Sequence, residues 1–370
     1  MNELPEKGSR GLKAKGLRRV ADTWWALPLP VFLGVSAAYA VARSGVGIDG
    51  LARPFVEELV PSLPRLPPWP PLYHFLFYSP IGAINARLLG ISTLGPYVAM
   101  HVVVLVLGLG CTAWVINRAY GADAARLIAV LFAISQVPTM LLQRLGGYDP
   151  YSVVFAGLAS TAVFGPWGIF LGIGWSWAAS EQALLSLAGL LGLHVLLRRP
   201  LRPLLWIGAG LAIGRVALQI WLHSASVKGS RLDWIRHFGL RMFVDMFVQG
   251  LPWLVLTGAG AVPVFAAIHL AQMTPGRTPR GRVAAAWGLT ILLPLFAVVL
   301  VDDEGRVLSA LQWPLLVVMG LVAAGSLSTA RLSRISALVS VLALAVPAVL
   351  VSHGKVFLAS HHVLRLLPWW

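Results

Sequence analysis

Long apolar runs separated by short polar stretches account for most of this chain. A run of about 17 to 25 apolar residues is long enough for an α-helix to cross the hydrocarbon core of a bilayer. When shorter runs are allowed where neighbouring helices shield the ends, the pattern predicts about eleven helices. The predicted helices cover residues 24–43, 94–117, 125–143, 151–164, 166–179, 182–197, 203–222, 250–271, 284–301, 307–324 and 336–352.

The three runs between residues 151 and 197 are short for a bilayer. Pro166 and Gly168 mark a turn between the first two runs, because proline and glycine interrupt helices. We therefore expect broken or half-buried helices in this part of the chain, shielded by the rest of the protein.

Two of the polar stretches are longer than simple connectors. Residues 44–92 contain SLPRLPPWPPLYHFLFYSP, whose prolines favour an extended backbone and whose aromatic residues are typical of a membrane interface. In residues 223–249, apolar and charged side chains fall largely on two sides of one helix, which predicts an interfacial amphipathic helix. Its apolar side holds Leu232, Ile235, Phe238, Phe243, Met246 and Phe247, and its charged side holds Arg231, Arg236, Arg241 and Asp245.

No repeat, heptad pattern or low-complexity linker divides the chain. The fold class that we expect is all-α, a polytopic integral membrane protein with one membrane domain over residues 24–352. A basic cytoplasmic segment, residues 1–23, precedes that domain, and an exoplasmic or interfacial tail, residues 353–370, follows it.

The composition agrees with a membrane protein. Of 370 residues, 58% are hydrophobic and 12% are charged, and the mean hydropathy is +0.78, which is above the range of soluble domains. A net charge of +15 could suggest nucleic acid as a partner. The basic residues instead lie in short clusters between apolar runs, without an aromatic-and-basic binding module, so we expect no nucleic-acid partner. The single cysteine, Cys111, excludes an intramolecular disulfide and a CxxC pair.

The basic clusters also predict the orientation, because lysine and arginine in short loops stay in the cytoplasm. A basic N-terminus precedes an apolar run without a small-residue cleavage site, which indicates a retained signal-anchor helix. With the N-terminus inside a multi-pass protein of the cell membrane, every short basic loop falls on the cytoplasmic side. These loops hold Arg118, Arg126, Arg198, Arg199, Arg202, Arg277, Arg280, Arg282, Arg331 and Arg334.

The same orientation collects most acidic residues at exoplasmic helix ends, although acids contribute little to topology. A set of acids gathered from distant parts of the sequence onto one face suggests chemistry there. The set contains Asp49, Glu57, Glu58, Asp149, Glu181, Asp233, Asp245, Asp302, Asp303 and Glu304.

The stretch VDDEGRVLSALQWP, residues 301–314, carries the densest group of acids. Asp302 and Asp303 form a candidate site for a divalent cation, Mg²⁺ or Mn²⁺, and both are candidate catalytic acids. Arg306 follows them at the start of a helix, where a guanidinium can clamp a phosphate oxygen. The alternative is a hydrophilic turn that separates two helices.

The stretch GGYDPY contains the second candidate, Asp149. An aspartate before a proline is also a good helix N-cap, which is the structural alternative. Its neighbours Arg144, Tyr148 and Tyr151 supply donors and flat surfaces suited to a sugar or a lipid phosphate, so we assign them to substrate binding.

Two further acids lie near predicted helix ends. Glu181 follows Ser180, which suits a helix start, and Arg215 in the next run is its natural partner if the two side chains meet. Asp49 lies in a glycine-rich turn after the first helix. Both acids are candidate catalytic residues, and a simple cap, turn or ion pair is the alternative for each.

Aromatic residues of the first long loop complete the set of candidates for substrate binding. Trp69 and Tyr73 offer stacking surfaces, while His74 can titrate or bind a ligand, although a packed histidine is the structural alternative. The chain contains no GxSxG, HExxH, P-loop or Rossmann motif, which argues against soluble-nucleotide chemistry.

In its layout the chain resembles the GT-C superfamily of integral membrane glycosyltransferases. The shared features are about eleven predicted spans, an N-terminus inside, a long first exoplasmic loop and acids at exoplasmic helix ends. The resemblance implies transfer of a sugar from a polyprenyl-phosphate donor in the membrane lipid to an acceptor of the cell envelope. It also implies that the acid after the first helix is a catalytic base or a metal ligand, and Asp49, or else Glu57 or Glu58, takes that position.

Two other functions fit the same residues. A transporter or flippase would use Glu181 and Arg215 as coupling or gating residues, and it would place acids near the bilayer midplane. A polymerase or ligase of surface polysaccharide would use a similar carboxylate site on a lipid-linked substrate.

Overall fold

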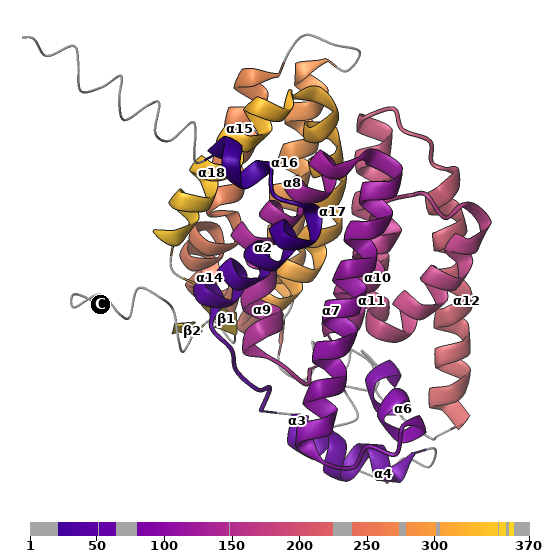
Figure 1. The fold of residues 1–370 in the computed structure, drawn as a ribbon. Helices are drawn as coiled ribbons and strands as arrows, with labels where there is room; N and C mark the ends of the chain where they lie inside the picture. Colours follow the sequence, from indigo (N-terminus) through magenta and orange to yellow (C-terminus); the bar gives the residue numbers. More distant parts are fainter. Residues whose placement is uncertain are drawn as a thin grey trace, which may run out of the picture.

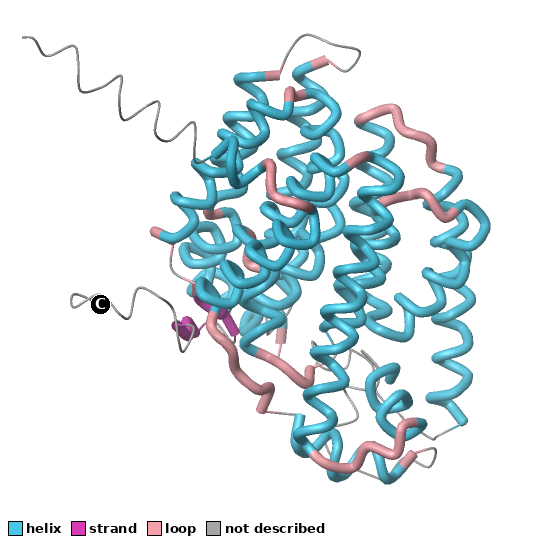
Figure 2. The backbone as a smooth tube through the Cα atoms, in the orientation of Figure 1, coloured by secondary structure: helices cyan, strands magenta, loops and turns pink. Residues whose placement is uncertain are grey.

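The structure, a computed structural model, is a bundle of helices with one small two-stranded sheet (Figures 1 and 2). It describes residues 21–50, 52–63, 80–147, 149–224, 239–273, 279–300, 304–346, 348–352 and 355–358.

The helices and helical turns follow the order of the chain. The first half contains α2 (Leu29–Ser44), α3 (Ala52–Pro54), η1 (Phe55–Leu59), α4 (Val60–Ser62), α6 (Pro80–Leu88), α7 (Leu94–Tyr120), α8 (Ala122–Ile134), α9 (Val137–Gln143), α10 (Asp149–Ser160), η2 (Gly165–Trp167) and α11 (Gly168–Leu196). The second half contains α12 (Arg202–Ser224), α14 (Leu240–Trp253), η3 (Leu254–Ala259), α15 (Ala261–Gln272), α16 (Arg280–Ala297), η4 (Val298–Leu300), α17 (Glu304–Ser326), α18 (Thr329–Leu344), β1 (Val349–Ser352) and β2 (Lys355–Leu358).

The described part of the chain has four helices that are long and apolar enough to cross a membrane, or up to six when each of two bent helix pairs counts as one span. The protein is therefore an α-helical protein with four to six candidate spans, and the count of about eleven expected from the apolar runs is not confirmed. By length and composition the four are Leu94–Tyr120, Gly165–Leu196, Arg202–Ser224 and Gly305–Ser326, of which the second is kinked at Ala179 and is not one straight helix.

Helix α17 lies in the middle of the bundle and packs against α8, α10, α11 and α16 (Figure 1). Of its most apolar window, 89% is buried inside the protein, compared with 33% for α7. A helix that is apolar on all sides and surrounded by protein forms the core. The long exposed apolar side chains lie instead on outer helices such as α7, whose Val106 and Leu107 are exposed, as expected for a surface in contact with lipid.

Basic loops meet at one end of the bundle. Asp123, at the start of α8, accepts hydrogen bonds from Trp25 Nε1 at 2.8 Å and from Thr329 Oγ1 at 2.6 Å. Arg126 donates to the carbonyl oxygen of Leu27, and Arg331 donates to that of Gln272. These bonds join four loops that are far apart in the sequence.

The opposite end contains α3, η1, α4 and α6, which pack around Tyr97 and the last turns of α12 (Figure 1). Helix α7 connects the two ends, since Tyr97 lies in its first turn and Tyr120, which donates to Thr161 O, ends it. Its 27 residues correspond to about 40 Å, enough to cross a bilayer. The proline-rich stretch that was expected to favour extended backbone, residues 62–80, lies almost entirely outside the described residues, so that expectation stays a prediction; the described remainder of 44–92 is largely helical.

The run 125–143, predicted as one helix, is broken. Helices α8 and α9 meet at an angle of 63° across Ser135 and Gln136. The buried guanidinium of Arg43 donates to Ser135 O at 2.7 Å and to Ala343 O at 3.2 Å. Carbonyl groups at the ends of α8 and α18 thus solvate this cation, because a helix C-terminus carries partial negative charge. The run 250–271 is similarly bent by 51° between α14 with its following turn and α15.

Helix α11 turns back on itself at Ala179, whose backbone is not helical (φ −166°, ψ 72°). Methyl groups built on Gly172 and Gly208 would lie 2.7 Å from Leu211 N and 3.2 Å from Leu187 Cδ2, respectively. Residues 172 and 187 therefore contact the same two turns of α12, although a straight helix would separate them by about 22 Å. The expectation of broken helices between residues 151 and 197 is correct here, with the break at the end of the predicted run 166–179.

The last predicted helix, residues 336–352, is wrong in its second half. Helix α18 ends at Leu344, and residues 349–352 form β1, which pairs antiparallel with β2. Proline at 347 disfavours helix for the residue before it, and the valines that follow favour a strand. The all-α prediction therefore has this hairpin as an exception.

The amphipathic segment is described only from residue 239 onward. In α14, Phe243 is buried, whereas Arg241 and Asp245 are exposed and lie 3.8 Å apart. These three residues follow the expected division of the helix faces. Leu232, Ile235 and Phe238 lie outside the described residues, so the interfacial helix stays a prediction.

Candidate functional site

Two of the predicted acids meet at Gly147. A methyl group built on this glycine would lie 3.1 Å from Asp49 Oδ2 and 3.7 Å from Asp149 Oδ2. Because both carboxylates approach one point so closely, they are neighbours, although the two residues are separated by more than a quarter of the chain. We call Asp49 and Asp149 the acid pair.

Backbone hydrogen bonds hold the acid pair in place. The segment after α2 lies alongside the segment after α9, and the two exchange bonds between Leu145 N and Gly47 O, at 3.1 Å, and between Asp49 N and Leu145 O, at 2.9 Å. The chain then turns through Gly146, whose φ of +89° suits glycine. Asp149 follows in the first turn of α10 and is 1% exposed, whereas Asp49 is half-buried.

Arg306 approaches the acid pair from the central helix. Its Nε atom lies 3.8 Å from Asp149 Oδ1, and the side chains are 13% and 2% exposed. A buried carboxylate is costly unless a positive charge compensates it, and Arg306 supplies that charge. The predicted acid at one helix start and the predicted arginine at another are thus brought together.

Polar aromatic residues line the side of the acid pair formed by α6 and α7. Tyr97 packs near Gly146, and its ring lies 4.4 Å from that of His101. The His101 ring meets the edge of Tyr151 at 5.5 Å, and the Tyr151 hydroxyl accepts a hydrogen bond from Asn85 Nδ2 at 3.1 Å. Of these residues, only Tyr151 was predicted from the sequence.

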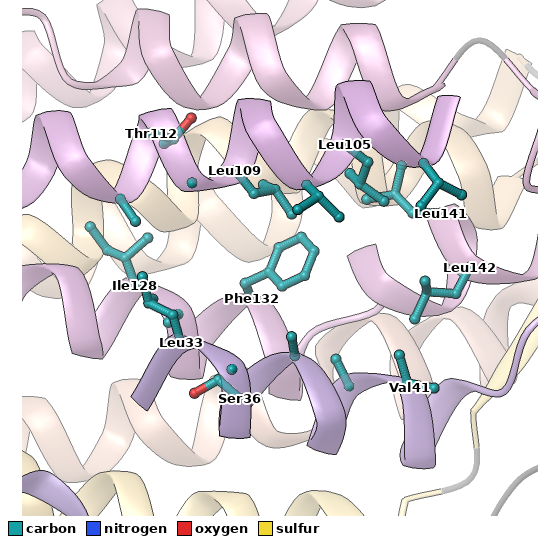
Figure 3. Close-up of a pocket in the computed structure, with 18 of the residues that line it drawn as sticks. Leu33, Ser36, Val41, Leu105, Leu109, Thr112, Ile128, Phe132, Leu141 and Leu142 are labelled. Atoms are coloured by element: carbon teal, nitrogen blue, oxygen red, sulfur yellow. The ribbon is translucent and has the colours of Figure 1, made fainter. Parts of the chain in front are cut away.

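An apolar groove ends beside the acid pair. It lies between α2, α7, α8 and α9, has a volume of about 570 Å³ and is lined almost wholly by carbon atoms (Figure 3). Phe132 points into its middle, between Leu33 and Ser36 of α2 and Leu105 and Leu109 of α7 (Figure 3). The groove extends to Val46 and Leu145, which flank the segments that carry the acid pair.

Helices α2, α7, α8 and α9 line this groove, and none of its lining residues lies between residues 151 and 197.

Other predicted residues lie elsewhere or outside the described chain. Glu181 lies just after the turn of α11, and no ion pair found among the described residues joins it to Arg215 of α12. Arg144 lies in the turn before Gly147, whose N–H donates to the Arg144 carbonyl at 3.0 Å. The remaining candidates lie outside the described residues, namely Trp69, Tyr73, His74, Tyr148, Asp302 and Asp303.

A metal site was predicted at Asp302 and Asp303. In the part of the chain that the structure describes, no group of three or more histidine, cysteine or acidic residues is arranged to hold a metal ion. In the acid pair and Arg306, the guanidinium can bind an anionic group of a substrate, and the carboxylates can accept hydrogen bonds from its hydroxyl groups.

A buried histidine at the other end of the bundle is fully used in packing. Trp287 Nε1 donates to His269 Nδ1 at 3.0 Å, so the neutral ring carries its proton on Nε2 and donates to Ser326 Oγ at 2.8 Å. A histidine that donates to the serine cannot serve as its base. This pair is therefore not a nucleophile and base of the kind used in acyl transfer.

Comparison of the chain with protein-family models, curated proteins and solved structures found no match. The assignment of function therefore rests on the geometry of the site.

The sequence does carry one signal for Tyr97 and His101, which were not among the predicted site residues. Tyr97 and His101 are four positions apart within an apolar run, which places both on one face of a helix. Polar residues at membrane depth are functional candidates by default.

Proposed function

We propose that this protein is an integral membrane glycosyltransferase that moves a sugar from a polyprenyl-phosphate donor to an exoplasmic acceptor. The observation that carries the proposal is the acid pair, with Arg306 beside Asp149, at the end of an apolar groove. A lipid-linked phosphate needs those three elements, namely a base, a cation and a channel for an apolar chain.

In the proposed reaction, a carboxylate removes the proton from the acceptor hydroxyl. The acceptor oxygen then forms a bond to the anomeric carbon of the sugar, while the bond from that carbon to the phosphate oxygen breaks. The electron pair leaves with the lipid phosphate, and the guanidinium of Arg306 neutralises the developing charge. The proton remains on the carboxylate until the products leave.

The two acids of the pair differ in burial, and we assign them different roles in the proposed reaction. Asp149 is buried against Arg306, so its carboxylate orients the guanidinium. Asp49 is half-buried at the same point, where an acceptor can reach it. We therefore assign the base to Asp49 and the positioning of Arg306 to Asp149. Tyr151, on the first turn of α10, lies two residues beyond Asp149 and contacts His101, which places its ring beside the proposed position of the sugar.

The test of this proposal is transfer by the purified protein in lipid vesicles. Polyprenyl phosphate carrying a radiolabelled hexose or pentose is the donor, and a cell-envelope fraction is the acceptor. Asp49→Asn should lower the transfer rate by about a hundredfold or more, because removal of a general base typically costs that much. Glu57→Gln is the matched control, since Glu57 lies on the same end, exposed and paired with Arg53 at 3.6 Å. Equal rates for Asp49→Asn and the wild type would refute the assignment.

A transporter or flippase is the second candidate, because three helices are interrupted. The breaks between α8 and α9, after α14 and within α11 resemble the discontinuous helices of transporters. A vesicle assay with a fluorescent polyprenyl phosphate separates the two functions. Movement of the lipid between leaflets without sugar transfer would favour the transporter.

A further inference from the structure

His101 carries a buried nitrogen that the described structure does not satisfy. The residue is 0% exposed, and its Nδ1–H donates to the Tyr97 carbonyl at 2.9 Å. A carbonyl can only accept, so Nδ1 holds the proton and Nε2 presents a lone pair. Among the described residues, no group donates to that Nε2 atom.

An unsatisfied acceptor of this kind is expensive. Leaving a buried polar atom without a partner costs about 1–3 kcal/mol, and buried polar atoms are rarely left so. A phenylalanine or leucine would fill the same volume without that cost. The same feature occurs at His194, so at His101 it points to a bound group only together with the polar side chains that surround it.

Other hydrogen-bonding groups surround the same place. A methyl group built on Gly82 of α6 would lie 3.0 Å from His101 Nε2 and 3.5 Å from the Tyr97 hydroxyl, so both polar atoms face the bare backbone of α6. One turn further along α6, Asn85 donates to the Tyr151 hydroxyl. That hydroxyl keeps its own hydrogen to donate, and the Asn85 carbonyl oxygen remains an acceptor.

This set of donors and acceptors suits a polyol. Alternating acceptors and hydroxyl donors, set among aromatic rings, match the hydroxyl groups and flat faces of a sugar. The set also borders the acid pair, since Tyr151 lies two residues beyond Asp149 and Tyr97 packs near Gly146. Arg306, which contacts Asp149, comes from a different element, α17.

We propose that His101, Tyr97, Asn85 and Tyr151 form the subsite that recognises the sugar, with His101 Nε2 accepting a hydrogen bond from a sugar hydroxyl. The inference rests on the proposed function and specifies which part of the donor each side of the site binds. The sugar lies against α6 and α7, and the phosphate lies against Arg306.

Nitrogen NMR on protein labelled with ¹⁵N-histidine, in phosphatidylcholine nanodiscs, tests the subsite directly. The ligands are polyprenyl phosphate and the same lipid carrying glucose, galactose, mannose or arabinose. At least one sugar-bearing lipid should shift the Nε2 resonance of His101, whereas polyprenyl phosphate alone should not. His194 is the internal control, because its Nδ1 likewise donates to a carbonyl and its Nε2 is buried without a partner, but it lies at the basic end.

Phosphorus NMR of the same samples separates the two hypotheses. Broadening of the lipid phosphate line by the wild type, and not by Arg306→Gln, would show that the phosphate binds where the proposed function requires. If it binds but no sugar moves the His101 resonance, or polyprenyl phosphate alone moves it, the subsite is refuted and the proposed function stands. If no phosphate line is broadened, both are refuted.

Variants provide a kinetic check of the same subsite. His101→Phe should raise the KM for the donor about tenfold, the loss of one hydrogen bond, and His101→Gln, which restores an acceptor, should recover most of it. For a sugar-donor lipid that lacks the recognised hydroxyl group, the wild type and His101→Phe should have the same KM. The subsite is refuted if removal of any one sugar hydroxyl raises the KM of His101→Phe by the same factor as it raises the KM of the wild type.

Discussion

Two arginine–aspartate pairs in this protein have the same separation and different surroundings. Arg306 Nε lies 3.8 Å from Asp149, and Arg241 Nε lies 3.8 Å from Asp245. The side chains are 13% and 2% exposed in the first pair and 93% and 61% exposed in the second. Water screens the second pair almost completely, so burial and not distance decides what each pair contributes.

Removal of Arg306 should therefore destabilise the protein. In Arg306→Gln the buried Asp149 carboxylate loses its compensating charge, and we expect a loss of about 3 kcal/mol. Arg241→Gln should cost about 0.5 kcal/mol or less. The measurement is reversible unfolding in mixed micelles. The double variant Arg306→Gln with Asp149→Asn should regain stability relative to Arg306→Gln, and a further loss would contradict this account.

Sequence patterns identified individual residues of the site but not their partners. Asp149 and Arg306 stand out because each is a charge at the edge of an apolar run. Each residue could also be explained locally, as a helix cap or as part of a turn. Only the contact between Asp149 and Arg306 favours a shared site over these local explanations. His101 was missed because one histidine in an apolar run carries no local sign that its outer nitrogen lacks a partner.

At the scale of elements, glycines decide how closely α11 and α12 pack. A methyl group on Gly210 would lie 2.8 Å from the Ile169 carbonyl carbon and 2.9 Å from its Cα atom. These contacts are with backbone, which cannot move aside as a flexible side chain can. Close backbone approach through small residues is how helices associate when lipid surrounds them.

Gly210→Ala should separate α11 from α12 and lower the stability by about 1–3 kcal/mol, as overpacking does. Gly110→Ala is the matched control on α7, because no atom lies within 4 Å of the added methyl group. This control should be neutral or stabilising by up to about 1 kcal/mol. Thermal denaturation in detergent measures both. Similar midpoints for the two variants would contradict the tight contact.

The elements themselves were predicted well where one helix is long and unbroken. The runs 94–117, 203–222 and 307–324 correspond to α7, α12 and α17 within a few residues. The interruptions at Ser135 and Gln136 and at Gly260 were not predicted, because the hydropathy of the chain continues through them. At the first of these, Arg43 donates to the Ser135 carbonyl at the break itself and to the Ala343 carbonyl of α18, which joins the break to another helix.

At the scale of the molecule, the two ends of the bundle carry different charged groups. Arg126, Arg280 and Arg331, near the starts of α8, α16 and α18, donate to backbone carbonyls at one end, and the acid pair lies at the other. The proposed function requires the acid end to face the exoplasmic side.

Cysteine labelling tests that orientation. In a Cys111→Ala background, Glu57→Cys and Gly281→Cys each place one thiol at an exposed position, at the acid end and at the basic end respectively. A membrane-impermeant maleimide should label Glu57→Cys in intact cells, and Gly281→Cys only after permeabilisation. The reverse pattern would place the acid pair in the cytoplasm and exclude an exoplasmic donor.

The sequence by itself determined that this is a helical protein with apolar helices suited to a bilayer, because the hydropathy of a helix is the sum over residues that are adjacent in the sequence. It also determined the candidate acids and the division of charge, since both follow from positions along the chain. Only the tertiary structure decided that Asp49 meets Asp149, that Arg306 approaches them and that α11 turns back at Ala179. These features arise from packing between segments that are far apart in the sequence, and no local sequence pattern specifies which of these segments pack together.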